Sequence, residues 1–267
     1  MRTFLIVMAS ILVVSVSTSV YAIDVYIVAG QSNGWRISTL AQGGGKLKGK
    51  IHYFGMKCVS EPTQGRFRTL TGLNEKTMGS VLGKSLSDIS SDDIVFIQFC
   101  RCGAGVWDKR KQGWYPGDDP KNGKVHDDGL YGCFTQYIKH ARGVVEHKLK
   151  LKWEVKGLFW HQGESDSRAE HVGKYEDRLG NLFYRFRNDL GANLPIVIGP
   201  VRELNDLNKK INAITKKMAD ADANMAVIDV KGLTFESPTN VHFNRAGCHE
   251  MTRRMAAAYG KMASLHK

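Results

Sequence analysis

The stretch VYIVAGQSNGWRIS, residues 25–38, indicates the fold of this chain because it reads as a strand followed directly by a helix. Apolar and β-favouring residues run into the turn GQSNG, residues 30–34, which fits the G-x-S-x-G pattern of a serine nucleophile on such a turn. Taken alone the pattern is weak, since small residues at strand–helix turns also serve as helix caps. Ser32 therefore needs partners elsewhere in the sequence before it can be given a chemical role.

The same strand-then-helix pattern recurs along the chain. Apolar runs predict five strands, at residues 24–29, 93–99, 155–161, 194–200 and 224–230. Their almost unbroken apolar character suits parallel strands that are covered on both faces. Helical spacing of apolar residues predicts helices at about 78–89, 131–148, 170–190, 206–218 and 245–261. This alternation is typical of one doubly wound α/β domain.

The amino-terminal end has the composition of a secretory signal peptide. Arg2 supplies a positive start, residues 4–16 are almost wholly apolar, and the tripeptide VYA at 20–22 places small residues at the −3 and −1 positions of a cleavage site. We expect residues 1–22 to be removed, leaving 23–267 as a single domain of a secreted or periplasmic protein. An uncleaved membrane anchor is the alternative, but the apolar core is short for a span.

Composition and charge narrow the class of protein. Of 267 residues, 42% are hydrophobic and 24% are charged, which excludes disordered and fibrous proteins. Without Arg2, 37 basic residues face 26 acidic ones, a net charge of +11 that favours anionic partners such as an acidic polysaccharide. The lysines are scattered and are not interleaved with aromatic residues, so nucleic acid is not expected. The ordinary alternative is a solvated basic surface.

The five cysteines point to disulfides rather than to a metal. They are Cys58, Cys100, Cys102, Cys133 and Cys248, and an exported protein can oxidise them. An odd count leaves at least one thiol unpaired in a monomer. We expect one or two bridges, whose pairing the sequence does not assign, and their spacing is no zinc signature.

Polar residues cluster where predicted strands end. Two long segments, 33–76 and 103–129, read as loops that begin at strand ends, and such loops are usually functional. Further clusters are CRCGAGVW at 100–107, GLFWHQGESDS at 157–167 and SPTNVHFNRAGCHE at 237–250. Ligands of open α/β sheets bind at the carboxyl ends of the strands, so the fold should gather these segments and Ser32 into one cleft.

These motifs carry a family resemblance. GQSN after the first strand, a glycine turn followed by Trp, WHQGESD in mid-chain and VHFNRAG near the end resemble the SGNH/GDSL hydrolase superfamily. The closer likeness is to its sialate O-acetylesterase-like branch and to the acetylxylan esterases of carbohydrate esterase family six. The resemblance covers essentially the whole mature chain. It implies a flavodoxin-like three-layer α/β/α sandwich with a five-stranded parallel sheet.

The resemblance also implies an activity and site residues. It indicates a serine esterase that removes O-acetyl groups from an acetylated polysaccharide or sialic acid, with no metal and no organic cofactor. Ser32 matches the nucleophile, and His242 matches the histidine base. The backbone N–H groups of Ser32 and Gly103 and the side-chain amide of Gln162 match the oxyanion hole.

One position departs from the superfamily pattern. The pattern places an Asp three residues before the histidine, but here Thr239 precedes His242 at that spacing. A hydroxyl can accept the Nδ1–H bond but supplies no negative charge to the imidazolium. Either the site runs as a Ser–His dyad, or another carboxylate orients the base. We expect Glu164 in that role, with Asp166 and Glu236 as weaker candidates.

Two functions of other classes remain open at this stage. A carbohydrate-binding pseudoenzyme would explain the missing Asp, and a lipid-directed GDSL hydrolase would share the nucleophile turn. Trp114 and Tyr115, in a polar loop, are candidates for a platform on which a sugar stacks. The sequence does not distinguish acetylxylan, O-acetylated sialic acid, pectin and sulfated polymers as substrates, nor does it indicate the oligomeric state.

Overall fold

The computed structural model describes residues 21–39, 45–55, 66–73, 81–90, 92–107, 113–117 and 129–264. Apart from its last two residues, the predicted signal peptide lies outside this part of the chain. None of the helices in the described ranges combines the length and the apolar character that crossing a bilayer requires.

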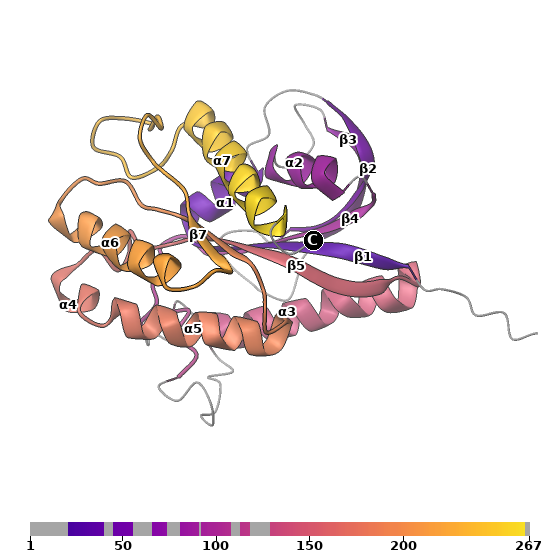
Figure 1. The fold of residues 1–267 in the computed structure, drawn as a ribbon, viewed down its shortest axis with the longest axis horizontal. Helices are drawn as coiled ribbons and strands as arrows, with labels where there is room; N and C mark the ends of the chain where they lie inside the picture. The colour runs from indigo at the N-terminus through magenta and orange to yellow at the C-terminus, as the bar shows by residue number, and fades with distance from the viewer. Residues whose placement is uncertain are drawn as a thin grey trace, which may run out of the picture.

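A central sheet of seven strands runs through the described residues (Figure 1). The strands are β1 (Ala22–Gly30), β2 (Gly45–Gly55), β3 (Arg66–Leu73), β4 (Ile94–Cys100), β5 (Lys152–His161), β6 (Ile196–Gly199) and β7 (Met225–Val227). Their order across the sheet is β3-β2-β4-β1-β5-β6-β7. Every neighbouring pair is parallel except β2 with β3, which is antiparallel.

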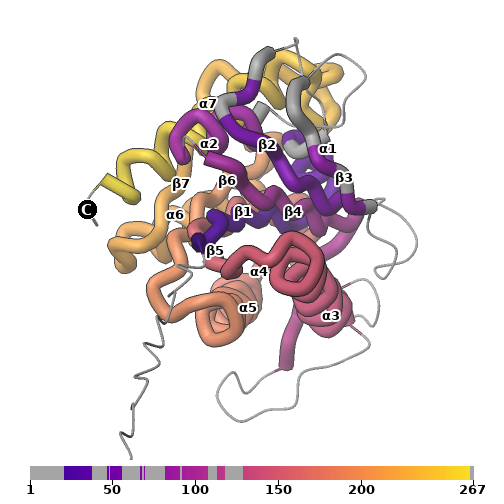
Figure 2. The backbone as a smooth tube through the Cα atoms, turned by 90° about the vertical axis from the view of Figure 1, so that its right-hand side faces the viewer, coloured from indigo at the N-terminus to yellow at the C-terminus, as the bar shows by residue number. Residues whose placement is uncertain are grey.

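Helices cover both faces of the sheet. They are α1 (Ser32–Thr39), α2 (Val81–Ser90), α3 (Leu130–Gly143) with its π-helical continuation η1 (Val144–Leu149), α4 (Ala169–Val172), α5 (Tyr175–Leu190), α6 (Asp206–Asp220) and α7 (Arg245–Ser264). Turned by 90°, the chain shows α2 and α7 on one side of the sheet and α3 and α5 on the other (Figure 2). The three-layer α/β/α sandwich expected from the sequence is therefore confirmed.

The core explains why the strands read as unbroken apolar runs. Along β1, Val25 and Ile27 point into the cluster beneath α3 and α5, whereas Tyr26 and Val28 point into the cluster beneath α1, α2 and α7. All four side chains are at most 2% exposed. Because both faces are covered, alternation between apolar and polar residues is absent, as parallel strands in this fold class require.

The strand count differs from the prediction. All five predicted strands are present, but β2 and β3 extend the sheet beyond them, and both lie in the segment 33–76 that reads as a loop. The sequences of these two strands, GKLKGKIHYFG and RFRTLTGL, mix basic residues and glycines with apolar ones. Such a mixture resembles a polar loop, although residues 51–54 of β2 are buried between β3 and β4 and only β3 forms the edge of the sheet.

The cysteines of the described residues include one that is disulfide-bonded and two buried thiols. Cys102 is disulfide-bonded, and its partner lies outside the described residues. Cys100 and Cys248 are buried thiols, and burial raises the pKa of Cys248 to about 12 and that of Cys100 well above its ordinary value. A raised pKa keeps a thiol protonated, so neither group is a nucleophile near neutral pH.

Candidate active site

The carboxyl end of β1 lies between two neighbouring strand ends. Gly30 pairs with Cys100 of β4 on one side and with His161 of β5 on the other. Its φ of +134°, and a would-be Cβ only 2.0 Å from the His161 carbonyl oxygen, admit only glycine here. The next residue, Gln31, donates its N–H to the same carbonyl at 2.9 Å. This close approach starts α1 at the carboxyl edge of the sheet, with Ser32 as its first residue.

Ser32 and His242 meet at this edge. The Ser32 Oγ lies 3.0 Å from Nε2 of His242, although the two residues are 210 positions apart in the sequence. His242 stands in the loop that connects β7 to α7. Ser32 is buried, with 7% of its surface exposed. A hydroxyl at hydrogen-bond distance from an imidazole is the arrangement from which a base can activate a serine.

Two arginines fix the loop that carries His242. Arg36, on α1, donates to the Glu236 carboxylate at 2.5 Å. Arg202, which follows β6, donates to the backbone carbonyl of Asn240 at 2.6 Å. Asn240 in turn accepts the backbone N–H of His242 at 2.9 Å. Of these residues, Arg36, Asn240 and His242 stand in the quoted motifs, whereas no motif contains Arg202.

None of the three candidate carboxylates is hydrogen-bonded to the imidazole of His242 in the described part of the chain. Glu164 accepts from the side-chain amide of Asn33 at 2.6 Å, and Glu236 pairs with an arginine as described above. Asp166 accepts from backbone and amide donors on the other side of Ser32. The direct contact expected between Glu164 and His242 is absent, because Oε1 of the glutamate accepts from the Asn33 amide instead.

The amide of Gln162 is also committed to internal partners. Its Nε2 lies 2.5 Å from Oδ2 of Asp166 and 3.2 Å from the carbonyl oxygen of Ala104. Oε1 of Gln31 is a third acceptor at 3.3 Å, so three acceptors surround an amide nitrogen that carries two hydrogens. With 1% exposure, the side chain joins the end of β5 to the turn after β4, and it has no N–H left for an oxyanion in this arrangement.

Gly103 lies in the turn that follows β4. The turn is closed by a hydrogen bond from Ala104 N to Arg101 O at 3.2 Å, and Arg101 N donates to the Gly30 carbonyl at 3.1 Å. Gly103 has a φ of +73°, a conformation that glycine adopts without strain. The turn therefore lies beside the start of α1, where Ser32 begins the helix.

Asp166 is a buried carboxyl whose neutral form the fold favours. Burial raises its pKa from 3.8 to about 6, and hydrogen bonds from Val106 N and Gln162 Nε2 offset this only in part. Both donors reach Oδ2, whereas Oδ1 is buried and has no hydrogen-bond partner among the described residues. Because the pKa is higher in the folded state, the stability from this group is complete below pH 3.8 and is lost as pH rises through about 6.

Replacing Asp166 with asparagine should remove this pH dependence. The substitution keeps one oxygen for both donors and, like the protonated acid, carries no charge. Between about pH 4 and pH 7, we expect the free energy of unfolding of D166N to rise relative to wild type by on the order of 2–3 kcal/mol. Urea denaturation of both proteins at the two pH values measures the change. If the free energies of unfolding of the two proteins differed by the same amount at both pH values, burial would not raise the pKa of Asp166 as described.

The predicted sugar platform is wrong. Trp114 is 0% exposed, and its indole N–H donates to the Gly30 carbonyl at 3.0 Å. Its ring packs edge-to-face against Phe99 and Trp160 inside the core. Tyr115 is 6% exposed. The polar sequence around these two aromatic residues suggested a surface loop, but the large rings fill the layer beneath α3 and α5.

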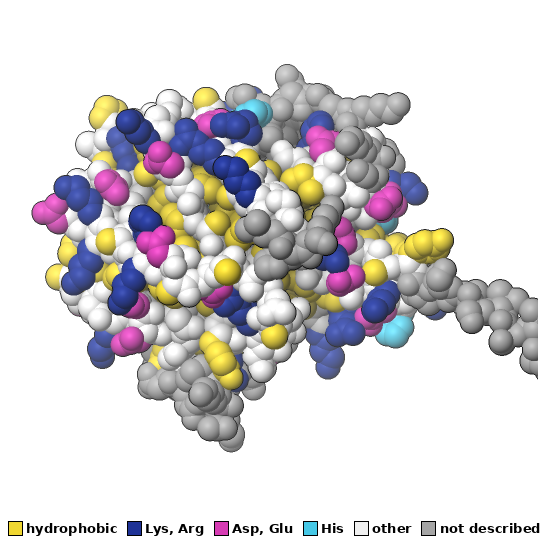
Figure 3. Space-filling model, in the orientation of Figure 1, with side chains coloured by type: hydrophobic (Ala, Val, Ile, Leu, Met, Phe, Trp, Pro, Cys, Tyr) yellow, Lys and Arg dark blue, Asp and Glu magenta, His cyan; other side chains and the backbone are white. Residues whose placement is uncertain are grey.

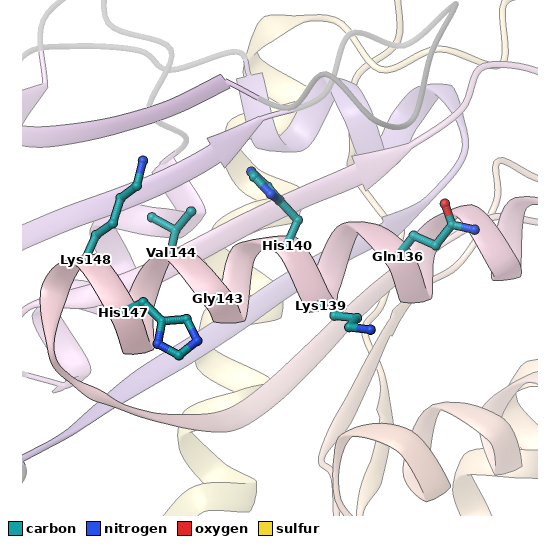
Figure 4. A pocket seen from close by; sticks show the side chains of 7 residues that line it. All are labelled: Gln136, Lys139, His140, Gly143, Val144, His147 and Lys148. Atoms are coloured by element: carbon teal, nitrogen blue, oxygen red, sulfur yellow. The ribbon is translucent and has the colours of Figure 1, made fainter.

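Other surface features lie away from Ser32. A hollow of about 480 Å³ over α3 and η1 is lined by Lys139, His140, His147 and Lys148 (Figure 4). His140 and Lys148 point to one side of the helix, whereas Lys139 and His147 point to the other, so they do not converge on one ligand. Figure 3 shows Lys and Arg interspersed with Asp and Glu across one face. No three His, Cys, Asp or Glu side chains in the described ranges gather as a metal site needs.

Comparison with known proteins gives one family and several similar folds. Residues 81–261 match the family model described as carbohydrate esterase, sialic acid-specific acetylesterase. No curated protein sequence matches the chain significantly. The fold is similar to that of a protein from Arabidopsis thaliana, at 17% identity and a TM-score of 0.61 over 88% of this chain and 97% of the other.

Two further solved structures are similar to this chain. A carbohydrate acetylesterase from Xanthomonas citri has a TM-score of 0.63 at 14% identity, over 90% of this chain and 57% of that one. NanS has a TM-score of 0.60 at 16% identity, over 92% of this chain and 99% of the other. At these identities the structures establish a shared fold.

Proposed function

The chain belongs to the carbohydrate esterase family of sialic acid-specific acetylesterases, and on that premise we propose that it removes O-acetyl groups from an acetylated sialic acid through an acyl-enzyme on Ser32. Family membership makes it a carboxylic ester hydrolase of the acetylesterase type, as the sequence motifs predicted. The observation that carries the proposed mechanism is the 3.0 Å contact between the Ser32 Oγ and His242 Nε2.

The proposed reaction proceeds in two halves. Nε2 of neutral His242 takes the hydroxyl proton as the Ser32 Oγ attacks the acetyl carbonyl carbon, which gives a tetrahedral intermediate. The imidazolium then protonates the sugar oxygen, the C–O bond breaks, and the acetyl group stays on Ser32. In the second half water replaces the sugar, and His242 takes a proton from it as its oxygen attacks the acyl carbon. The C–O bond to Ser32 then breaks, the imidazolium returns the proton to the Ser32 Oγ, and acetate is released.

Backbone donors are proposed to hold the oxyanion. Ser32 and Gly103 follow the ends of β1 and β4, so their backbone N–H groups both lie at the carboxyl edge of the sheet. Each such donor is worth on the order of 3 kcal/mol in the transition state. The amino-terminal end of α1 adds a favourable dipole at the same point. For Gln162 to act as a third donor, it would exchange its bond to Asp166 or Ala104 for one to the oxyanion.

The net charge of the chain supports a sialic acid or another acidic sugar as the substrate. The mature chain, with a net charge of +11, attracts anions more strongly than neutral xylan. We propose that residues 1–22 direct export, so the enzyme meets its substrate outside the cytoplasm. Exported protein that begins at Ile23 is the form to be tested.

Acetate release from a panel of substrates tests the function. The panel contains O-acetylated sialic acids, acetylxylan and acetylated pectin, together with p-nitrophenyl esters of increasing acyl length. We expect the highest kcat/KM on O-acetylated sialic acid and a decline beyond the acetyl ester. A preference for long acyl chains would instead indicate a lipid-directed hydrolase. Sugar binding with no turnover on any ester would indicate a pseudoenzyme.

A further inference from the structure

The loop that bears His242 is attached to the residue next to the nucleophile. Asn33, the second residue of α1, is 0% exposed and makes three hydrogen bonds. Its Nδ2 donates to the carbonyl oxygen of Val241 at 3.0 Å, and its Oδ1 accepts from the N–H of Phe243 at 3.2 Å. Asn33 thus holds the backbone on both sides of His242.

The third bond joins Asn33 to the expected acid. The second hydrogen of Nδ2 goes to Oε1 of Glu164 at 2.6 Å. A carboxylate only accepts, so this bond determines which end of the amide is nitrogen and turns Oδ1 toward Phe243. The side chain of Glu164 is 5% exposed, which strengthens a charge-assisted bond of this kind.

We propose that Asn33 is a positioning residue that holds the His242 imidazole against Ser32, and that Glu164 acts through Asn33 rather than on the imidazole itself. The inference rests on the proposed function of the Ser32–His242 pair. It gives the glutamate a role in a site where none of the carboxylates in the described residues touches the base.

The surroundings of Glu164 leave Asn33 as its main partner. His161 also lies close to the carboxylate, with Nδ1 at 3.7 Å from Oε1 of Glu164. Burial lowers the pKa of His161, so the ring is neutral near pH 7 and does not balance the carboxylate charge. Oε2 of Glu164 is buried without a partner in the described part of the chain. The amide of Asn33 therefore both stabilises the buried charge and is oriented by it.

Helix α1 consequently carries the nucleophile and also holds the base in place. Ser32 and Asn33 are consecutive on α1, and they hold His242 by its ring and by its flanking backbone. A displacement of about 1 Å of a reacting group can cost about 100-fold in rate. Loss of the Asn33 amide should therefore lower kcat while the binding of the sugar, and so KM, changes little.

The first test uses variants of similar shape. Asn33→Asp removes both N–H donors and places a second carboxylate beside Glu164. We expect kcat to fall about 100-fold or more, with KM nearly unchanged. In the double variant Asn33→Asp with Glu164→Gln, the new amide donates to the new carboxylate, which restores their bond with reversed polarity. The double variant should be at least about tenfold more active than Asn33→Asp alone, a rescue that only coupled residues show.

The variant Glu164→Gln separates direct from indirect action. A neutral oxygen can still accept from Asn33, so we expect kcat to fall less than about tenfold. The acid limb of the kcat/KM profile should stay in place. A direct partner of the imidazole would behave otherwise, with a loss of hundreds-fold or more and an acid limb shifted to lower pH.

The chain offers a matched control for Asn33. Asn212 on α6 makes the same three kinds of bond, donating to Val201 O at 2.9 Å and to Glu203 at 3.1 Å and accepting from Val201 N at 2.9 Å. Asn212→Asp should leave kcat unchanged. Thermal melting of every variant shows whether a loss of activity is a loss of fold.

A readout without substrate keeps this inference separate from the proposed function. The ¹⁵N chemical shifts of the His242 imidazole report its contact with Ser32 in wild type, and they should change in Asn33→Asp but not in Asn212→Asp. If wild type lacks esterase activity, the proposed function is wrong, but these shifts still test whether Asn33 positions the His242 imidazole. Unchanged shifts and wild-type kcat in folded Asn33→Asp, or a double variant no better than the single, would overturn the inference.

Discussion

Replacing Ser32 with alanine is expected to abolish acetate release, lowering kcat by about 10⁴-fold or more. The Ser32 Oγ is the atom that carries the acetyl group in the proposed mechanism, and it lies 3.0 Å from its base. Without it, water must attack the ester directly. The remaining oxyanion donors and substrate contacts supply only about 10³- to 10⁴-fold over the uncatalysed reaction.

The measurement is kcat for O-acetylated sialic acid and for p-nitrophenyl acetate. Ser237→Ala is the control, because the Ser237 side chain is exposed and its carbonyl, which alanine retains, is what Arg202 contacts. We expect wild-type kcat for the control. Turnover by folded S32A comparable to that of wild type would remove Ser32 from the mechanism.

Replacing His242 with alanine is expected to lower kcat by about 10⁴- to 10⁶-fold, the scale on which a serine hydrolase loses its base. Nucleophile and base act as a unit, so the double variant S32A with H242A should be no slower than either single variant. In wild type, kcat/KM should fall toward acid pH, because a protonated imidazole cannot accept the serine proton.

His249→Ala provides the matched control for this substitution. His249 lies in the first turns of α7, and the contact recorded for it, from Thr252 Oγ1 at 2.7 Å, uses its backbone carbonyl. Its removal should leave both kcat and the acid limb unchanged. If H242A kept a tenth of wild-type activity with an intact fold, the 3.0 Å contact would be structural and the base would lie elsewhere.

Most of the fold could be predicted from the sequence because its signals are local. Each of the five predicted strands contains a short apolar run, which is the composition that parallel strands covered by helices require. The strands β2 and β3 were missed because glycines and basic residues interrupt their apolar residues. An antiparallel edge carries mixed residues whose partner strand, rather than their own composition, makes them a strand.

The candidate site divides in the same way. Ser32 and His242 could be proposed from GQSN and VHFNRAG, since parallel strands bring their carboxyl ends to one edge. The hydrogen bonds of Glu164 and the burial of Trp114 could not be predicted from the sequence. Each depends on which side chains from distant parts of the sequence lie closest in the fold. Asn33 and Val241 are 208 residues apart, and nothing in either segment indicates that they meet.

The apolar strands, the amphipathic helices and the nucleophile turn were thus determined by the sequence, through constraints that act within a few residues. Only the tertiary structure decided that a buried amide, rather than a carboxylate, holds the base. Hydrogen bonds are short-ranged and directional, so the choice among several nearby acceptors is made by packing to within an ångström. If this chain released no acetate from O-acetylated sugars although Ser32 and His242 are in contact, the proposed reaction on Ser32 would be wrong.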